Sequence, residues 1–386
     1  MAEPAPLRLL YVQPAVSVGG AERQASLLAA ALRDEGIEST VVSGPGRVLD
    51  GWVAAAGVAH RRSPHFAGRG GWSPRRWPES VGRLASLLDQ LDRLHEQAPF
   101  DVAVGSLGEG WAATGFFGRR HGVPVLWRAG GMSLGRTSAR WSPEALGVRL
   151  LARVLAPRRI VCNARAVERY WSSMTATPVA TIPNVEPSLG DGLRPTSLVA
   201  RTIGYLGRLA PEKGLEPLLE AFAAVAPEVP GCTLVVGGPG DTGPFVERAR
   251  ALGLAGRVRF PGFVDDVEGF LSGCDLLVLP SLMEGSSNVL LEAFACGVPV
   301  LATRVGGTEE LIADGVDGWL VPPDDARLLA RALTTALTSP ERRGAMARRA
   351  RRRLQSHAPE AVAARWATLL RRVVATGPAR EGPPGG

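Results

Sequence analysis

The feature that most constrains the fold is an alternation of short apolar runs with longer amphipathic segments, which occurs twice along the chain. In the first half, strands are expected at Leu7–Val12, Ser39–Val42, Asp101–Gly105, Pro124–Trp127 and Arg159–Val161. In the second half, they are expected at Thr202–Leu206, Thr233–Val236, Val258–Phe260, Leu276–Leu279, Pro299–Ala302 and Gly318–Val321. Strands that alternate with helices predict a parallel sheet with helices on both faces.

The alternation is interrupted at residues 186–195, which are rich in proline and glycine and typical of a linker. We therefore expect an α/β protein with two Rossmann-like, doubly wound domains, residues 1–188 and 198–360, facing each other across a cleft. A helix at 361–376 is expected to pack back on the first domain, and residues 377–386 to form a disordered tail. The arginine-rich stretch Arg342–Arg353 is expected to be a solvated helix face.

Composition excludes several classes of protein. The 386 residues are 45% hydrophobic and 21% charged, which is typical of a globular chain. No apolar run reaches the ~18 residues of a membrane-spanning helix, and no signal peptide is expected at the start. The four cysteines are scattered without paired spacing, which argues against a zinc site or disulfide framework and for a cytoplasmic location.

The positive charge lies in the first half of the chain. Residues 1–190 contain 22 arginines and 15 acidic residues, whereas residues 191–386 contain 22 basic and 22 acidic residues. The formal net charge of +7 therefore belongs to the first half. A basic half beside a neutral one predicts an anionic partner, such as a phosphate-bearing substrate or a membrane surface.

The segment from Pro280 to Glu292 follows a predicted strand and opens a helix near Ser287 and Asn288, which are good N-cap residues. Backbone amides at such a helix start form an anion site. Glu292 has no residue of opposite charge three or four positions away in its helix. A carboxylate among apolar residues is costly unless it is exposed or bound to something, and both alternatives stay open.

Two further loops follow predicted strands. Gly207 to Gly214 carries Arg208 and Lys213, the only lysine of the chain, in a turn that suits a diphosphate or, equally, two solvated charges. Gly19 and Gly20 would let a ligand approach the backbone closely, although an ordinary turn fits as well. Neither loop is a dinucleotide-binding fingerprint or a phosphate loop of the Gly-rich Lys-Ser/Thr type.

Together these segments resemble the family-4 retaining glycosyltransferases of GT-B fold. The resemblance rests on Gly19-Gly-Ala-Glu-Arg, on Gly207-Arg-Leu-Ala-Pro-Glu-Lys-Gly, on the pair Glu284 and Glu292, on Ala295-Cys-Gly-Val-Pro-Val and on Val305-Gly-Gly-Thr-Glu-Glu. It covers nearly the whole chain in order, densely from Gly204 to Pro323. It implies a first domain for the acceptor and a second for a nucleotide-sugar donor.

The resemblance also implies a role for each matching residue. Arg208 and Lys213 would hold the donor diphosphate, Glu284 would contact the donor sugar, and Glu292 would accept the ribose hydroxyls. The amides of Ser287, Asn288, Val289 and Leu290 would face sugar and phosphate. Gly20 would approach the phosphate across the cleft, and Val264 would lie by the base. The family needs no metal or other cofactor, and Asp265 and Asp266 fit a helix start better than a metal site.

The acceptor side departs from the family pattern. Many relatives have a histidine where this chain has Arg128, so Arg128 and Glu109 are the local candidates for acceptor or sugar contact. Residues 60–77 mix five arginines with Phe66, Trp72 and Trp77. This mixture suits a membrane interface, a pyrophosphate-lipid acceptor, nucleic acid or a solvated loop.

The sequence therefore predicts a cytoplasmic, metal-independent, retaining hexosyltransferase, peripheral at an anionic membrane. It would use a UDP- or GDP-linked sugar and a lipid-linked, polysaccharide or small-molecule acceptor. One alternative is a sugar-nucleotide epimerase of GT-B fold, which would convert the donor without an acceptor. The other is a basic nucleic-acid-binding protein, against which the neutral second half argues.

Overall fold

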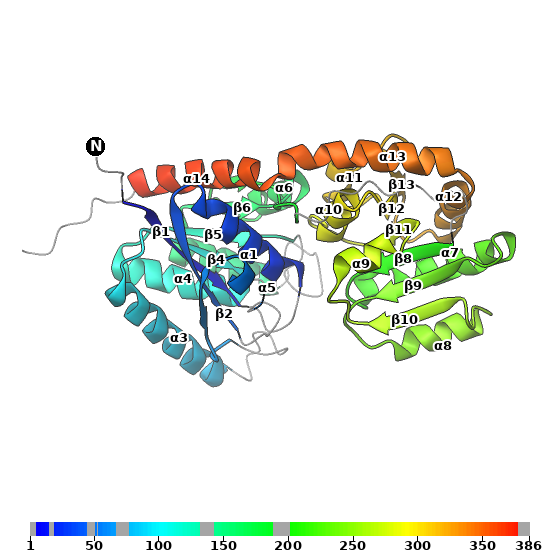
Figure 1. Ribbon diagram of the computed structural model, residues 1–386. Helices are drawn as coiled ribbons and strands as arrows, with labels where there is room; N and C mark the ends of the chain where they lie inside the picture. The colour runs from blue at the N-terminus through cyan, green and yellow to red at the C-terminus, as the bar shows by residue number, and fades with distance from the viewer. Residues whose placement is uncertain are drawn as a thin grey trace, which may run out of the picture. The chain divides into compact units, whose positions relative to one another are not determined.

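The computed structural model describes residues 5–14, 19–44, 51, 53–66, 77–131, 143–187 and 201–376 (Figure 1). The chain divides into two compact units. Unit 1 comprises Met1–Val185 and Ala358–Gly386, and unit 2 comprises Glu186–His357. The first unit was expected to end at residue 188 and the second at 360. The expected tail, residues 377–386, and most of the linker lie outside the described residues.

Unit 1 is built on a seven-stranded sheet with the strand order β3-β2-β1-β4-β5-β6-β7. All six neighbouring pairs are parallel. The strands are β1 (Leu7–Gln13), β2 (Ile37–Ser43), β3 (Ala59–Arg62), β4 (Val102–Ser106), β5 (Val125–Ala129), β6 (Arg159–Cys162) and β7 (Val179–Thr181). The helices are α1 (Gly20–Arg33), α3 (Trp77–Gln97), α4 (Leu107–His121), α5 (Pro143–Leu155), α6 (Arg165–Ser172) and α14 (Pro359–Ala375).

Helices cover both faces of this sheet because side chains alternate along its buried strands. Leu9 and Tyr11 of β1 pack with α1 and α14, whereas Leu10 and Val12 pack with α3, α4, α5 and α6. The last helix of the chain therefore returns to unit 1. Phe66 is buried in the second of these cores. The side chain of Phe66 is therefore not available for a surface contact of the segment 60–77.

Unit 2 is built on a six-stranded parallel sheet with the order β10-β9-β8-β11-β12-β13. The strands are β8 (Thr202–Leu206), β9 (Thr233–Gly237), β10 (Val258–Gly262), β11 (Leu276–Leu279), β12 (Val300–Thr303) and β13 (Trp319–Val321). The helices are α7 (Leu215–Val225), α8 (Gly243–Ala251), α9 (Val267–Ser272), α10 (Asn288–Ala295), α11 (Thr308–Leu311), α12 (Ala326–Thr338) and α13 (Pro340–Arg352).

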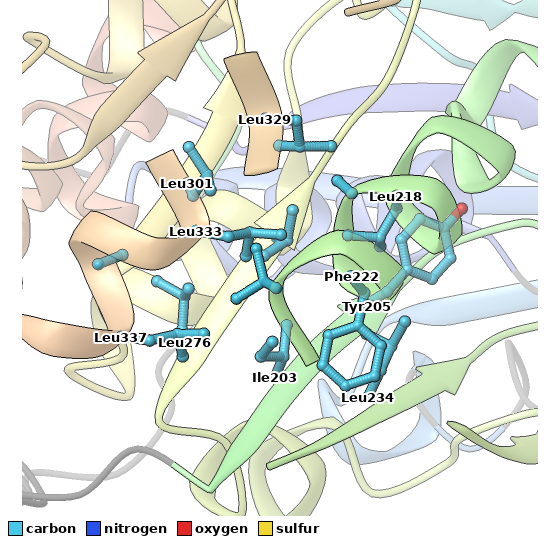
Figure 2. Packing of buried hydrophobic residues seen from close by; sticks show 14 of the residues in the cluster. Ile203, Tyr205, Leu218, Phe222, Leu234, Leu276, Leu301, Leu329, Leu333 and Leu337 are labelled. Atoms are coloured by element: carbon cyan, nitrogen blue, oxygen red, sulfur yellow. The ribbon is translucent and has the colours of Figure 1, made fainter. Parts of the chain in front are cut away.

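The core of unit 2 fixes the sheet against helices α7 and α12. Figure 2 shows Leu218 and Phe222 of α7 and Leu329 and Leu333 of α12 packed over Ile203 of β8 and its neighbours. Each of these five side chains is at most 2% exposed. A rigid sheet of this kind holds the loops at its carboxyl edge in place.

The structure departs from the predicted elements at three places. Strands β3 and β7, of four and three residues, were not predicted, since runs this short at sheet edges carry little pattern. The helix expected at 361–376 begins two residues earlier, at Pro359, after a 3-10 turn at Arg353–His357 that separates it from α13. Proline disfavours helical backbone at the preceding Ala358, which is extended here (ψ 141°).

The described residues contain neither a candidate membrane-spanning helix nor a candidate metal-binding cluster. No helix in that part of the chain combines the length and apolarity that a membrane span requires. Nor do three or more His, Cys, Asp or Glu side chains gather there in a way that could hold a metal ion.

Candidate functional site

The strand order of unit 2 reverses between β8 and β11, which lie side by side at the centre of the sheet. Ligands of open α/β sheets bind beyond the carboxyl ends of the strands at such a switch point. The loop after β8 contains Arg208 and Lys213, and the loop after β11 contains Glu284. The fold therefore brings together two of the loops that the sequence analysis selected.

These two loops are bonded to each other through the backbone. The amide of Leu282 donates to the carbonyl of Glu212 at 2.8 Å. Gly214 has a left-handed conformation (φ +66°), and a Cβ there would lie 1.9 Å from the carbonyl oxygen of Pro280. Only glycine permits this conformation and this approach, which explains the glycine at the start of α7.

Lys213 and Glu284 form an ion pair at this junction. The Lys213 Nζ lies 2.6 Å from Glu284 Oε1, and their side chains are 17% and 10% exposed. The hydroxyl of Ser281 donates to the same carboxylate oxygen at 2.8 Å. Ser281 is fully buried, and its carbonyl accepts a hydrogen bond from the hydroxyl of Thr303, at the end of β12. The carboxylate is thus held from two sides.

Arg208 occupies a more open position on the same loop. Its guanidinium pairs with Glu212 at 2.9 Å, and its side chain is 63% exposed. The backbone beneath it is fixed, because the buried Tyr205 hydroxyl donates to the Arg208 carbonyl at 2.8 Å. Burial, with the nearby Glu284 carboxylate, raises the pKa of Tyr205, so the phenol remains a donor.

Helix α10 begins at the end of the Glu284 loop. Ser287 is its N-cap, without a side-chain cap bond, and Asn288 is its first residue. The side chain of Leu290 is buried in the core, so only its backbone amide is available to a ligand at the start of the helix. First-turn amides have no acceptor within their own helix and carry the positive end of its dipole.

Glu292 lies in the second turn of α10 and is 5% exposed. It takes part in a polar or electrostatic interaction with the protein. Of the two alternatives that the sequence left open, an exposed carboxylate is therefore excluded, and a bound one remains. Burial of the charge still requires a polar environment at this point of the helix.

Val264 follows β10 and packs against the end of β9. A Cβ placed on Gly237 would lie 2.8 Å from Val264 Cγ2. Asp266 caps helix α9 by accepting from the Gly269 amide at 2.8 Å. The prediction of a helix start at this acidic pair is confirmed.

Unit 1 has its own switch point, between β1 and β4. Arg128, at the end of β5, donates to the Tyr11 hydroxyl at 3.1 Å and to Asn184 Oδ1 at 3.0 Å. The Tyr11 hydroxyl also lies 3.2 Å from the hydroxyl of Ser106. These bonds hold Arg128 among polar side chains at the carboxyl edge of the sheet.

Gln13 ends β1 at the same edge and is fully buried. Neither its amide oxygen nor its amide nitrogen has a hydrogen-bond partner among the described residues. Gly20 is the first residue of α1, and Glu22 in the same turn is 8% exposed, which raises the pKa of its carboxyl group. Glu109 lies in the first turn of α4, directly after β4.

The remaining predicted segment, residues 60–77, is described only in part. Arg61 and Arg62 are exposed on the edge strand β3. Trp72 and the arginines at 69, 75 and 76 lie outside the described residues.

The chemistry of the unit 2 site suits one kind of ligand. A lysine, an arginine and a helix start present positive charge and donors to an anion such as a diphosphate. The Glu284 carboxylate, already held by Lys213 and Ser281, can accept hydrogen bonds from hydroxyl groups. The site therefore suits a phosphorylated, polyhydroxylated molecule.

Comparison with known families gives two matches that together cover most of the chain. The model described as "Glycosyl transferases group 1" matches residues 200–339, and the model described as "Glycosyltransferase Family 4" matches residues 18–185. The chain belongs to the group 1, family 4 glycosyltransferases. The boundary between the two matches coincides with the division between the two units.

Curated relatives of this glycosyltransferase match it over part of their length. D-inositol 3-phosphate glycosyltransferase of Salinispora tropica is 33% identical over 225 residues, which are 50% of this chain and 46% of the relative. The lipopolysaccharide core biosynthesis glycosyltransferase LpsE of Rhizobium meliloti is 38% identical over 135 residues, or 35% of this chain and 38% of the relative. The chain therefore spans less than half the length of these relatives.

Solved structures show that the glycosyltransferase has the GT-B fold. HepE of Anabaena, in complex with UDP and glucose, superposes with a TM-score of 0.78 and 20% identity, covering 95% of this chain and all of that one. WaaG, a glycosyltransferase of lipopolysaccharide biosynthesis, superposes with a TM-score of 0.68 and 17% identity, covering 94% of this chain and 99% of the WaaG chain.

Several polar residues around both switch points of the glycosyltransferase were not predicted from the sequence. Ser281 and Tyr205 support the unit 2 loops, and Tyr11, Gln13 and Asn184 surround the edge near Arg128. One signal was visible, since Gln13 is a polar residue at the end of an otherwise apolar run. The others required knowledge of which strands are neighbours.

Proposed function

We propose that this glycosyltransferase transfers a hexose-type sugar from a nucleotide diphosphate donor bound at the unit 2 switch point. The observation that carries the proposal is the pairing of Lys213 with Glu284 where the β8 and β11 loops meet. Arg208 and Lys213 would bind the diphosphate, Glu284 the sugar hydroxyls, and Glu292 the ribose diol. The amides of Ser287 to Leu290 would face phosphate and sugar, and Val264 the base.

The Lys213 ammonium has enough hydrogen-bond donors to bind both Glu284 and a diphosphate. An ammonium group offers three N–H donors, of which one goes to Glu284, so two remain for diphosphate oxygens. The ion pair also fixes the conformation of the Lys213 side chain before the ligand binds. Such preorganised charge is worth most where negative charge develops, here on the departing diphosphate.

We propose that the reaction retains the anomeric configuration by attack on the same face of the sugar. The bond from C1 to the diphosphate oxygen breaks, the bond from C1 to the acceptor oxygen forms, and the acceptor proton passes to the diphosphate. This scheme needs positioning and stabilisation of the leaving group rather than a carboxylate nucleophile. It includes no metal or other cofactor, because Arg208, Lys213 and the α10 amides would neutralise the diphosphate.

For the donor we propose a UDP-linked sugar as the first choice, with GDP-linked sugars next. Support comes from HepE, a protein of the same fold whose structure holds UDP and glucose. For the acceptor we propose a hydroxyl group on an anionic molecule, either lipid-linked or soluble. The +7 charge of residues 1–190 and the names of the inositol phosphate and lipopolysaccharide core relatives support this choice.

We place the acceptor in unit 1, near Arg128. The buried amide of Gln13, without a partner among the described residues, supports a polar ligand there, because an unsatisfied buried group costs ~1–3 kcal/mol. Gly20 and Glu109 belong to the same carboxyl edge. We further propose a cytoplasmic location, supported by four free cysteines.

A donor screen tests the proposal. Thermal unfolding is followed with UDP-, GDP- and dTDP-sugars, since a ligand at ~100 times its dissociation constant adds ~2.7 kcal/mol of stability. The stabilising donor is then incubated with and without acceptor candidates, in the presence and absence of a chelator, and the anomer is identified by NMR. Stabilisation by none of the sugars contradicts the donor site. Conversion of the sugar nucleotide without acceptor supports epimerisation instead.

A further inference from the structure

The outer face of helix α5 in unit 1 is apolar although it is exposed. Leu146, Leu150 and Val154 follow at four-residue spacing and are 49%, 64% and 46% exposed. Phe116 of the neighbouring α4 is 41% exposed. We call these four side chains the apolar ridge. Single exposed apolar residues are common on soluble proteins, but a contiguous row marks an interaction surface.

Helix α5 is packed firmly against unit 1. Ala145, Ala152 and Leu155, on the opposite side of α5, are buried in the core of unit 1. A Cβ on Gly115 of α4 would lie 2.5 Å from Leu155 Cδ1, so the two helices are in close contact. The guanidinium of Arg119 also bonds to the Val154 carbonyl. The ridge therefore stands on a fixed scaffold.

The charges around the ridge are mostly positive. Helix α5 and the residues after it as far as 159 contain four arginines and one acidic residue, Glu144, at the start of the helix. Arg153 lies on the exposed side of α5, Arg158 follows the helix, and both are exposed. Arg119 and Arg120 at the end of α4 are exposed as well, Arg120 being bonded to Asp92 of α3. A helix that combines exposed apolar side chains with exposed arginines is typical of helices that lie in a membrane interface.

We propose that the apolar ridge docks on a bilayer that contains anionic lipids, with α5 parallel to its surface. Leucine, valine and phenylalanine side chains enter the acyl boundary while the arginines remain at the phosphates. A second copy of the chain fits less well. Two such faces paired about a two-fold axis would bring arginine against arginine, which is unfavourable, and one helix row is small beside a stable dimer interface.

This surface differs from the segment 60–77 that the sequence analysis selected. Strand β3, which carries Arg61 and Arg62, lies at one edge of the sheet, whereas α5 connects β5 and β6 near the other edge. The inference does not rest on the proposed donor, because no residue of the ridge belongs to the unit 2 site. Nucleotide binding and vesicle binding can therefore fail separately.

Flotation of the full chain with lipid vesicles tests the inference. The vesicles consist of phosphatidylcholine alone or mixed with phosphatidylglycerol, at low and high salt. We compare wild type with Leu146→Gln/Leu150→Gln and with Arg153→Gln/Arg158→Gln. The matched controls are Val81→Gln/Val316→Gln, at positions 52% and 49% exposed, and Arg93→Gln/Arg348→Gln, which replace exposed arginines elsewhere.

Wild type should float with the anionic vesicles at low salt and release at high salt. The leucine variant should bind more than about tenfold more weakly, and the arginine variant about 25-fold more weakly, at about fivefold per arginine. Both control variants should bind like wild type. Wild-type protein that ignores anionic vesicles overturns the inference. The inference is also overturned if light scattering shows that wild type is a dimer and the leucine variant a monomer, because the ridge is then an interface between two copies of the chain.

Discussion

Lys213 is the single lysine among 44 basic residues, and its position explains why an arginine would serve less well. Its ammonium lies 2.6 Å from Glu284 in a place where both side chains are mostly buried. An ammonium is a compact charge with three rotatable donors, whereas a guanidinium is a wide planar fork. A carboxylate on one side and a diphosphate on the other require donors in several directions.

Removal of this ammonium is the first prediction. Lys213→Ala should lower the turnover of glycosyl transfer by about 100-fold or more, because one preorganised contact to the leaving group is lost. Steady-state kinetics at saturating donor measures the effect. Arg248→Ala, which breaks the exposed pair of Arg248 with Glu220, is the control and should leave turnover unchanged. Full turnover in Lys213→Ala would remove the lysine from the proposed mechanism.

The second prediction concerns the pH dependence of Tyr205. Burial raises the pKa of its phenol, so the folded protein keeps a proton that the unfolded chain loses near its ordinary pKa of 10.0. The resulting stability is fully present below pH ~10 and is lost as the pH rises further. Tyr205→Phe should lose about 1 kcal/mol near neutral pH with the bond to the Arg208 carbonyl.

Above pH ~10 the Tyr205→Phe variant should lose stability less steeply than wild type. Urea unfolding followed at a series of pH values measures both curves. Curves that remain parallel into the alkaline range would contradict a buried, proton-bearing phenol at this position.

At the scale of elements, the loop between β8 and α7 depends on one close approach, which gives the third prediction. Gly214→Ala adds a Cβ that would lie 1.9 Å from the Pro280 carbonyl oxygen. Gly231→Ala is a matched control, since Gly231 also has a positive φ (+78°) but no atom within 4 Å of the added Cβ. The control variant should lose ~1–2 kcal/mol in its free energy of unfolding, from backbone strain alone.

Gly214→Ala should cost more than this control, because the Pro280 loop must also move. The displacement should weaken donor binding as well, since Glu284 lies on that loop. Thermal unfolding and nucleotide titration of both variants measure the two effects. Equal losses in the two variants would mean that the loops are not locked together at this glycine.

The fourth prediction concerns the junction of α12 and α13. Arg343 is fully buried and donates to the carbonyls of Ala336 and Leu337 at 2.6 and 2.7 Å, at the end of α12. The expectation that Arg342–Arg353 is a solvated face is therefore wrong for this residue. Arg343→Met should destabilise unit 2 by ~2–3 kcal/mol. Arg348→Met, on the exposed side of the same helix, should change little, and a similar loss in both would contradict the capping role.

The alternation of strands and helices was enough to predict both sheets, because buried parallel strands are continuous apolar runs. Strands β3 and β7 were missed, since an edge strand of three or four residues buries too little to impose a pattern. The buried Arg343 could not be distinguished from its six arginine neighbours, because its burial depends on where α12 ends.

At the scale of the whole molecule, the loops of the site were predictable and their contacts were not. Strand–loop–helix transitions with glycine, arginine and glutamate were visible in the sequence. The pairing of Lys213 with Glu284 spans 71 residues and depends on β8 lying beside β11. The interaction of Glu292 was likewise not predictable, because the sequence does not show which groups surround a buried side chain.

Every role proposed above depends on unit 2 binding a nucleotide diphosphate between the Gly207–Gly214 loop and helix α10. Calorimetric titration of UDP into wild type, Glu292→Gln and the exposed control Glu220→Gln tests it most directly. UDP should bind to wild type and to the control, and about tenfold more weakly to Glu292→Gln, because a charge-assisted hydrogen bond becomes a neutral one. The melting temperature of Glu292→Gln should change little, since the side chain keeps its shape. Equal affinity for UDP in Glu292→Gln and wild type would rule out the proposed contact of Glu292 with the nucleotide.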